Sequence, residues 1–198
     1  MSRLSSPASA RNREPILAVL REHFSRPITV LEVASGAGEH ARWFAQSLPH
    51  LTWQPTDRDP LALQSIEAWR ADAPPNLLPP LALDAATPDD WPIAAADAIV
   101  CINMVHISPW AATEGLMTGA GRILPPGGLL YLYGPYREAG VETAPSNEAF
   151  DVDLKRRNPE WGLRSREEVE SLAREHGLEP AARIAMPANN LSLIFRRR

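Results

Sequence analysis

Residues Val30-Leu31-Glu32-Val33-Ala34-Ser35-Gly36-Ala37-Gly38 decide the fold class of this 198-residue chain. An apolar run that begins at Ile28 leads into a turn with two glycines, and Ala41, Phe44 and Leu48 follow at helical spacing. A strand, a glycine-rich turn and a helix in this order are typical of nucleotide-binding α/β proteins. Glycine lets a ligand come close to the free N–H groups and the positive dipole end of the helix.

The same unit recurs along the rest of the chain, where apolar runs alternate with helical periodicity. The predicted strands are 28–34, 51–57, 81–84, 98–103, 129–133, 179–186 and 190–196, and the later helices are 61–69, 109–123 and 165–176. The short turn Pro187-Ala188-Asn189-Asn190 predicts that the last two strands form an antiparallel hairpin. The fold class is therefore α/β, with a doubly wound, seven-stranded, mostly parallel, Rossmann-like sheet and a C-terminal antiparallel hairpin.

Two segments lack this pattern. Residues 1–12 are rich in Ser, Ala and Arg and predict a flexible tail, with Asn12 capping a first helix over 13–25. A single domain over 13–198 follows. Within it, residues 134–164 show no periodicity and predict an inserted loop. Because this loop carries Tyr136, Phe150 and Trp161, we expect it to close over the site.

Composition excludes several classes of partner. With 20 Lys+Arg against 24 Asp+Glu and a net charge of −4, the chain has no field that would concentrate nucleic acid. The apolar stretches are shorter than the roughly 20 residues that a membrane-spanning helix needs, so we expect no membrane partner. Cys101 is the single cysteine, which fits a reducing, cytoplasmic compartment.

The glycine turn also satisfies a cofactor-binding pattern. Gly36 and Gly38 stand in a G-x-G-x-x-G/A arrangement, and Asp57 follows about 20 residues later, where a ribose-binding carboxylate is expected. Glu32, Asp84 and the terminal hairpin together shift the interpretation from NAD to S-adenosylmethionine. A carboxylate inside this strand, such as that of Glu32, can bind the amino group of a methionine moiety. Two alternatives stay open. Asp57 could cap the next helix, although Asp59 could serve instead, and Asp84 could be a turn residue.

These features resemble class I S-adenosylmethionine-dependent methyltransferases. Residues 30–38 look like the first motif of that group, although Ala34 replaces its usual first glycine. More specifically, the chain resembles the methyltransferase-like protein 26 family. The matching stretches are 9–17, 34–40, 53–57, 103–110, 134–136, 157–162 and 186–191. This resemblance implies a fold and a cofactor but no settled acceptor.

The expected cofactor site gathers residues that follow successive strands of the sheet. Asp84 would accept a hydrogen bond from the adenine amino group, while the Ala85 N–H meets the ring. The full predicted set is Glu32, Ala34, Ser35, Gly36, Gly38, His40, Asp57, Asp84, Ala85, Asn103 and Met104.

Candidate catalytic residues follow the fourth strand. Asn103-Met104-Val105-His106 lacks the two prolines of enzymes that methylate nucleic-acid amino groups, which disfavours adenine or glutamine N-methylation. His106 could act as a base or fix the turn at 108–110. Tyr136 is a second catalytic candidate, and Trp110 and Asn147 are candidate substrate-binding residues, with core packing as the alternative for both aromatics.

No catalytic metal is expected, because the remaining histidines, His23, His40, His50 and His176, lack the spacing of a metal site. The sequence therefore predicts methyl transfer from S-adenosylmethionine to a small-molecule acceptor, in an unknown oligomeric state. Two rival functions stay open: a nonenzymatic S-adenosylmethionine-binding or interaction module, and an NAD(P)-dependent oxidoreductase.

Overall fold

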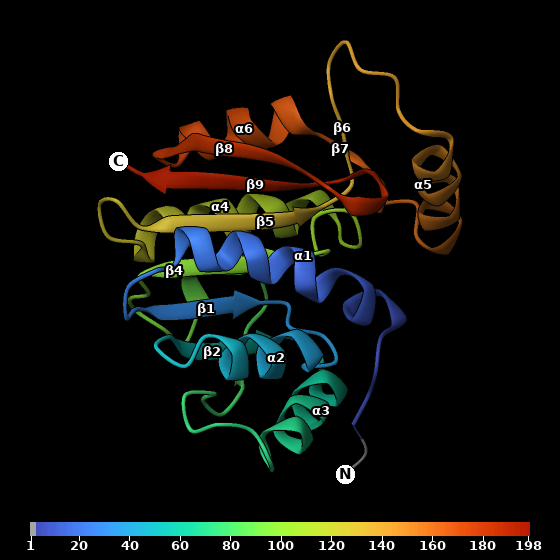
Figure 1. The fold of residues 1–198 in the computed structure, drawn as a ribbon. Helices are drawn as coiled ribbons and strands as arrows, with labels where there is room; N and C mark the ends of the chain where they lie inside the picture. Colours follow the sequence, from blue (N-terminus) through green and yellow to red (C-terminus); the bar gives the residue numbers. More distant parts are fainter. Residues whose placement is uncertain (1–2) are drawn as a thin grey trace.

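A seven-stranded sheet organises residues 3–198, the part of the chain that the computed structural model describes (Figure 1). Its strands are β1 (Thr29–Val33), β2 (Thr52–Asp57), β3 (Leu81–Ala82), β4 (Ala98–Ile102), β5 (Leu129–Gly134), β8 (Leu178–Met186) and β9 (Asn190–Arg197). They stand in the order β3-β2-β1-β4-β5-β9-β8. The first five pair parallel, and β9 runs antiparallel to both of its neighbours. The predicted doubly wound sheet with its C-terminal hairpin is confirmed.

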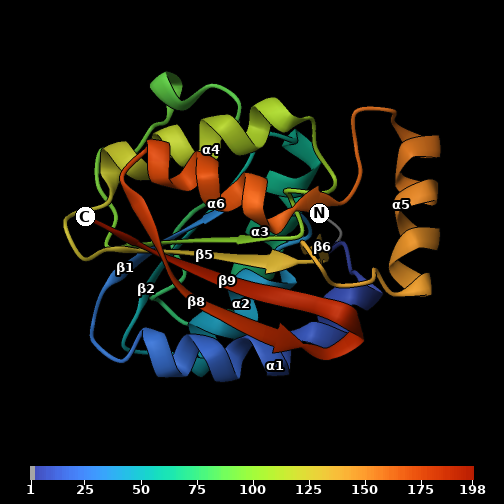
Figure 2. The ribbon, with the colours of Figure 1, turned by 90° about the horizontal axis from the view of Figure 1, so that it is seen from above.

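Helices cover both faces of this sheet (Figure 2). Helices α1 (Pro7–His23) and α2 (Glu39–Ser47) lie on one face, with α3 (Pro60–Arg70) beside α2, and α4 (Trp110–Ile123) and α6 (Arg166–Glu175) lie on the other. Neighbouring side chains of a strand therefore enter opposite cores. Val30 packs in the core under α1 and α2, and Leu31 packs in the core under α4, both fully buried.

The strand order reverses between β1 and β4, because the chain builds β2 and β3 on one side of β1 and then crosses to the other. Val33 at the end of β1 lies beside Cys101 of β4, so the loops after both strands start at the same edge of the sheet. In open α/β sheets, ligands bind in the crevice at such a reversal, outside the carboxyl ends of the strands.

The N-terminal helix begins at Pro7, earlier than the predicted residue 13. Ser6 is its N-cap and Pro7 its first residue, a position where proline is favoured because no N–H is needed. Asn12 is thus a buried residue inside the helix and not its cap. Before the helix, the Leu4 N–H donates to Ser65 Oγ at 2.8 Å, which holds this part of the predicted tail against α3. Residues 1–2 of that tail lie outside the described residues.

The predicted loop 134–164 is also partly regular. It contains β6 (Tyr136–Arg137), α5 (Pro145–Arg157) and the start of β7 (Arg164–Ser165), and β6 pairs with β7. The buried residues of α5 are Asn147, Asp151 and Leu154, so the helix has no apolar stripe for periodicity to reveal. Short 3-10 turns at Pro88–Asp90 and Pro187–Asn189 complete the elements.

Candidate functional site

Two cavities meet at the carboxyl ends of the parallel strands. The first, which we name the crevice cavity, has a volume of about 510 Å³ and lies where the strand order reverses. It is lined by Val33, Ala34, Gly36, Asp57, Arg58, Leu83, Asp84, Ala85, Ile102, Asn103, Met104, Ile107, Ser108, Pro109, Ala112, Asn158, Glu160 and Trp161. Seven of the predicted cofactor residues are in this set, namely Ala34, Gly36, Asp57, Asp84, Ala85, Asn103 and Met104.

The second cavity, which we name the helix cavity, has a volume of about 540 Å³ and lies between α1, the loop after β4 and the C-terminal hairpin. It is lined by Ala8, Arg11, Asn12, Pro15, Asn103, His106, Ile107, Tyr133, Pro135, Phe150, Pro187, Ala188 and Asn190. Asn103 and Ile107 line both cavities. The two cavities therefore adjoin at these two residues.

The glycine turn after β1 uses left-handed backbone at three positions, Ala34 (φ 59°), Gly36 (φ 56°) and Gly38 (φ 87°). The two glycines have different surroundings. A Cβ at Gly36 would meet nothing within 4 Å, whereas a Cβ at Gly38 would lie 2.9 Å from the Ile66 Cα. Gly36 is thus open to the crevice cavity, and Gly38 is required for packing between α2 and α3.

Asp57 stabilises this turn through hydrogen bonds to the backbone. Its Oδ2 accepts from the Gly36 N–H at 2.8 Å and its Oδ1 from the Asp59 N–H at 2.9 Å. Asp59 caps α3 through the Leu61 N–H, so the helix cap is not a task of Asp57. The Asp57 carboxylate therefore lies at the wall of the crevice cavity with both oxygens oriented by backbone donors.

Asp84 makes the contact of a turn residue and also lines the crevice cavity. Its Oδ1 accepts from the Ala86 N–H at 2.9 Å, which is the local contact of a turn residue. Its Oδ2 lies 3.4 Å from Arg58 Nη1, and both side chains belong to residues that line the crevice cavity.

Glu32 lies behind the glycine turn and not in the lining of the crevice cavity. It is 1% exposed, and its Oε2 accepts from Ser35 Oγ at 2.9 Å and from Trp53 Nε1 at 3.0 Å. Among residues 3–198, its Oε1 has no hydrogen-bond partner. Burial raises the pKa of Glu32 to about 7, although both hydrogen bonds oppose this shift.

This raised pKa predicts a pH-dependent stability. A carboxyl group whose pKa rises from 4.5 to about 7 on folding stabilises the protein below pH 4.5, and that contribution is lost as the pH rises through 7. The loss amounts to about 3 kcal/mol. We therefore expect the free energy of unfolding of Glu32→Gln, relative to that of the wild type, to rise by about 3 kcal/mol between pH 4.5 and 8, as measured by urea unfolding. A constant difference across this range would show that Glu32 is charged throughout.

His40 connects α2 to α1. Its Nε2 lies 2.8 Å from Asn12 Oδ1, and its ring stacks on Phe44 with 5.4 Å between the ring centres. Burial lowers its pKa to about 4, so the imidazole is neutral at pH 7. Like Glu32, Ser35 and Gly38, His40 does not line the crevice cavity, although it was predicted to bind the cofactor.

His106 lines the helix cavity and is 2% exposed. Its ring lies edge-on to Phe150, and its Nδ1 has no hydrogen-bond partner in the described part of the chain. Burial, and then the charge of Arg164, lower its pKa to about 3. The neutral ring can accept a hydrogen bond from a ligand, but it holds a proton poorly. Gly134 makes room for it, because a Cβ there would lie 2.9 Å from His106 Nδ1.

The other three candidate residues lie away from both cavities. The Tyr136 side chain is buried in the core under α4, where its hydroxyl has no partner within residues 3–198. Trp110 packs against that core and faces the Arg164 guanidinium, 5.7 Å from the ring centre. Asn147 Nδ2 donates to the Asn189 carbonyl at 3.0 Å and so ties α5 to the hairpin. The structure therefore does not bring these residues together with His106.

Residues from the segment 134–164 occupy part of both walls instead. Phe150 lines the helix cavity, and Asn158, Glu160 and Trp161 line the crevice cavity. Arg11, Asn158 and Glu160 were not among the predicted site residues, although they lie in the stretches 9–17 and 157–162, which carry part of the family resemblance. The stretch 157–162 was the signal available for Asn158 and Glu160.

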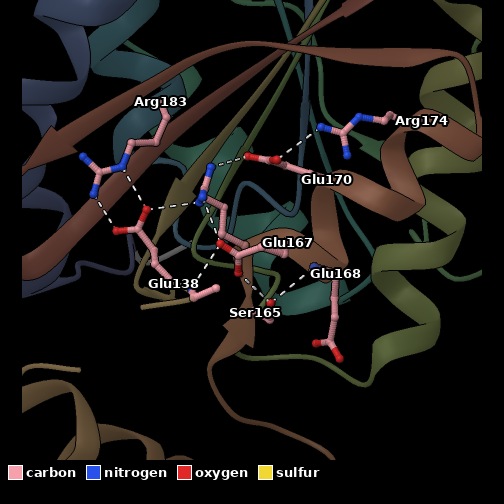
Figure 3. A network of polar contacts seen from close by, with 9 residues as sticks. Glu138, Ser165, Glu167, Glu168, Glu170, Arg174 and Arg183 are labelled. Carbon is pink, nitrogen blue, oxygen red and sulfur yellow. Dashed lines mark hydrogen bonds and ion pairs between the residues drawn. The ribbon is translucent and has the colours of Figure 1, made fainter. Parts of the chain in front are cut away.

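The segment is anchored by charged contacts at its first strand. Glu138 accepts from Arg183 of β8 at 2.5 Å (Figure 3). It also pairs with Arg166 of α6 at 3.1 Å. Ser165 caps α6 by accepting from the Glu168 N–H. Glu138, which follows β6, is thus tied to both β8 and α6.

Sequence comparison assigns the family. The profile of a family described as "Protein of unknown function (DUF938)" matches residues 3–197. The chain belongs to the DUF938 family. Within residues 3–198 of this DUF938 protein, no three His, Cys, Asp or Glu side chains gather as metal ligands would. None of the helices described is both long and apolar enough to span a membrane.

Solved structures share the DUF938 fold. An O-methyltransferase family protein from Burkholderia thailandensis matches with a TM-score of 0.81 and 18% identity over 96% of this chain. The S-adenosylmethionine-dependent methyltransferase SibL matches at 0.79 with 24% identity, and human N-acetylserotonin methyltransferase, solved with S-adenosylmethionine, at 0.79 with 13%, each over 96% of this chain. The DUF938 chain spans 57%, 55% and 52% of these proteins, respectively, a little over half of each. The likeness establishes the methyltransferase fold.

Proposed function

We propose that this DUF938 protein is a class I S-adenosylmethionine-dependent methyltransferase that acts on a small molecule. The observation that carries the proposal is the pair of cavities that meet at Asn103 and Ile107, where the strand order reverses. Methyl transfer needs two ligands in contact along one line, and this arrangement provides two adjoining sites. The resemblance to the methyltransferase-like protein 26 family and the shared fold support the same function.

The crevice cavity fits the cofactor. Its volume lies within the range of roughly 300–1,000 Å³ that small-molecule sites have. Gly36 leaves open space at the wall, and the carboxylates of Asp57 and Asp84 are fixed there for hydroxyl and amino donors. Glu32 Oε1 remains available behind the turn for an ammonium group. When bound, S-adenosylmethionine would supply an electrophilic methyl group.

The chain's own residues would then position the acceptor. Asn103, held in left-handed backbone (φ 64°) with its N–H donating to the Tyr133 carbonyl, forms the shared wall. Trp161 lines the crevice cavity and Phe150 lines the helix cavity, where the two rings would shield part of each bound ligand from water. His106 accepts a hydrogen bond from the acceptor hydroxyl or amine and so orients its lone pair. Because burial disfavours the imidazolium, any proton that His106 takes must pass on to water.

The proposal is tested by isothermal titration of wild type and Asp57→Asn with S-adenosylmethionine and with NAD⁺. We expect the wild type to bind S-adenosylmethionine only, and Asp57→Asn to bind it at least about tenfold more weakly, because a charged hydrogen bond contributes roughly 1.5–3 kcal/mol. Asp90→Asn, which changes an exposed acid away from both cavities, is the matched control. Preference for NAD⁺ would favour an oxidoreductase.

A second measurement separates catalysis from binding alone. The protein is incubated with S-adenosylmethionine and a broad acceptor panel, and S-adenosylhomocysteine is quantified. Tight binding without any turnover would favour a nonenzymatic binding module. A small-molecule acceptor agrees with one relative of the same fold, an O-methyltransferase family 2 protein from Planctomyces limnophilus, whose structure contains apigenin. We place the protein in the cytoplasm, because its one cysteine, Cys101, is buried and unpaired.

A further inference from the structure

We infer that the acceptor is an organic acid with an apolar body, and that Arg11 binds its negative charge at the helix cavity. This inference rests on the proposed function, because it assigns the substrate class of the same site. Four features of the helix cavity carry it: its charge, the helix that forms one wall, the apolar lining and the polar groups at its inner end.

The charge of the cavity comes from Arg11. It is the one permanently charged residue among the described residues that line this space, and no carboxylate faces it there. Arg11 is exposed and has no hydrogen bond or ion pair within residues 3–198, whereas neighbouring arginines are engaged. Arg3 pairs with Asp72 at 2.9 Å, and the Arg13 guanidinium lies 4.0 Å from the centre of the Trp43 ring. The Arg11 guanidinium is therefore free for a ligand.

The wall that carries Arg11 is the first half of α1. Ala8, Arg11, Asn12 and Pro15 are spaced by three, four and seven residues and so form one helical face toward the cavity. The first turn contains no acidic residue, but Glu39 of α2 accepts from the Ser6 N–H just before it, so the charge for an anion on this wall comes from Arg11. A second, independent feature points to a ligand here: His106 is 2% exposed in the opposite wall, and its Nδ1 has no hydrogen-bond partner within residues 3–198.

The lining between these ends is apolar. Ile107, Tyr133, Pro135, Phe150 and Pro187 supply it, which suits an aromatic or aliphatic body. At the inner end, Asn103 and His106 are polar but uncharged, so they can orient a hydroxyl or amine and do not attract an acid. The acid group thus binds toward α1, and the group to be methylated faces the crevice cavity.

The test compares matched acids and amides. A series of 4-hydroxyphenyl carboxylates of increasing chain length, from benzoate to butanoate, is titrated against the full chain saturated with S-adenosylhomocysteine, and each acid is paired with its primary amide. We expect the wild type to prefer acids over amides by about fivefold or more, as one charged hydrogen-bonded pair permits. Arg11→Gln should lose this preference, and Arg21→Gln, an exposed site farther along α1, should keep it.

Equal affinity of the wild type for acids and amides, failure to bind any acid of the series, or an acid preference that survives Arg11→Gln would overturn the inference. Titration with S-adenosylhomocysteine alone distinguishes this result from failure of the proposed function. If the cofactor product binds but the acid preference is missing, only the acceptor class is wrong. If the product does not bind while the preference depends on Arg11, the anion site stands and the methyltransferase proposal falls.

Discussion

A Gly36→Asn protein should stay folded and bind S-adenosylmethionine about a hundredfold more weakly than the wild type, whereas Gly38→Asn should lose stability. Asparagine tolerates left-handed backbone better than other side chains, so the same substitution suits both positions. At Gly36, the new side chain enters open space at the wall of the crevice cavity, where it blocks close approach of the ligand. At Gly38, its Cβ would lie 2.9 Å from the Ile66 backbone.

Thermal unfolding and isothermal titration measure the two effects separately. We expect Gly36→Asn to unfold within about 1 kcal/mol of the wild type, and Gly38→Asn to be destabilised by about 1–3 kcal/mol, the usual cost of overpacking. Gly38→Asn therefore serves as the control for changes in the turn that act through folding. Normal cofactor affinity in a folded Gly36→Asn protein would contradict the placement of the ligand against this turn.

The sheet could be predicted from sequence because each strand carries its own signal. A parallel strand buried on both faces, such as Ala98–Ile102, is a continuous apolar run, and the glycine turn marks the start of the next helix. The hairpin was equally local, since a short turn separates β8 from β9. These elements depend on neighbouring residues, and so the strand order followed from the fold class.

Two elements could not be predicted, because their stability depends on distant contacts. Residues 7–12 of α1 contain small and polar residues without periodicity, and the burial of Asn12 depends on His40 of α2. Helix α5 has a polar sequence, and Asp151 is 3% exposed because other parts of its segment surround it. Local sequence patterns contain no information about such contacts between residues that are distant in the sequence.

The candidate site also contains residues that could be predicted from the sequence and residues that could not. Residues at strand ends, such as Asp57 and Asn103, reach the crevice cavity because their place follows from the sheet. Sequence spacing alone could not distinguish these residues from others of the glycine-turn motif whose side chains point away from the crevice cavity. His40 belongs to the same motif as Gly36 yet contacts α1, and only the helix packing decides this. Arg11 was not predicted to be a site residue, because residues 1–12 were expected to form a flexible tail.

Asp151→Ala should loosen the segment 134–164 and speed its amide hydrogen exchange by about tenfold to a hundredfold. Its buried carboxylate links three parts of the segment: Oδ2 accepts from Lys155 at 2.6 Å and Arg137 at 3.1 Å, and Oδ1 accepts from the Leu163 N–H at 2.8 Å. Burial opposes its charge, but these hydrogen bonds outweigh it and hold the pKa of Asp151 below 3.8. Losing them should cost this segment about 1.5–3 kcal/mol of local stability.

The matched control is Asp153→Ala, which removes a carboxylate from the same helix that pairs only with the exposed Arg156. We expect its exchange to equal that of the wild type. In the wild type, the contribution of Asp151 is present above its unfolded pKa and is lost as the pH falls through its lower folded pKa, so the segment should also loosen in acid. Equal exchange in both variants would show that α5 is held by other contacts.

The same measurement with S-adenosylhomocysteine tests whether the segment closes over bound ligands. Phe150 and Trp161 bring it to the walls of both cavities, so ligand binding should slow its exchange in the wild type. In Asp151→Ala, part of the binding free energy must order the segment first, and we expect S-adenosylhomocysteine affinity to fall by up to about tenfold. Unchanged affinity together with fast exchange would mean that the segment borders the cavities without covering them, and that the acceptor site is open from this side.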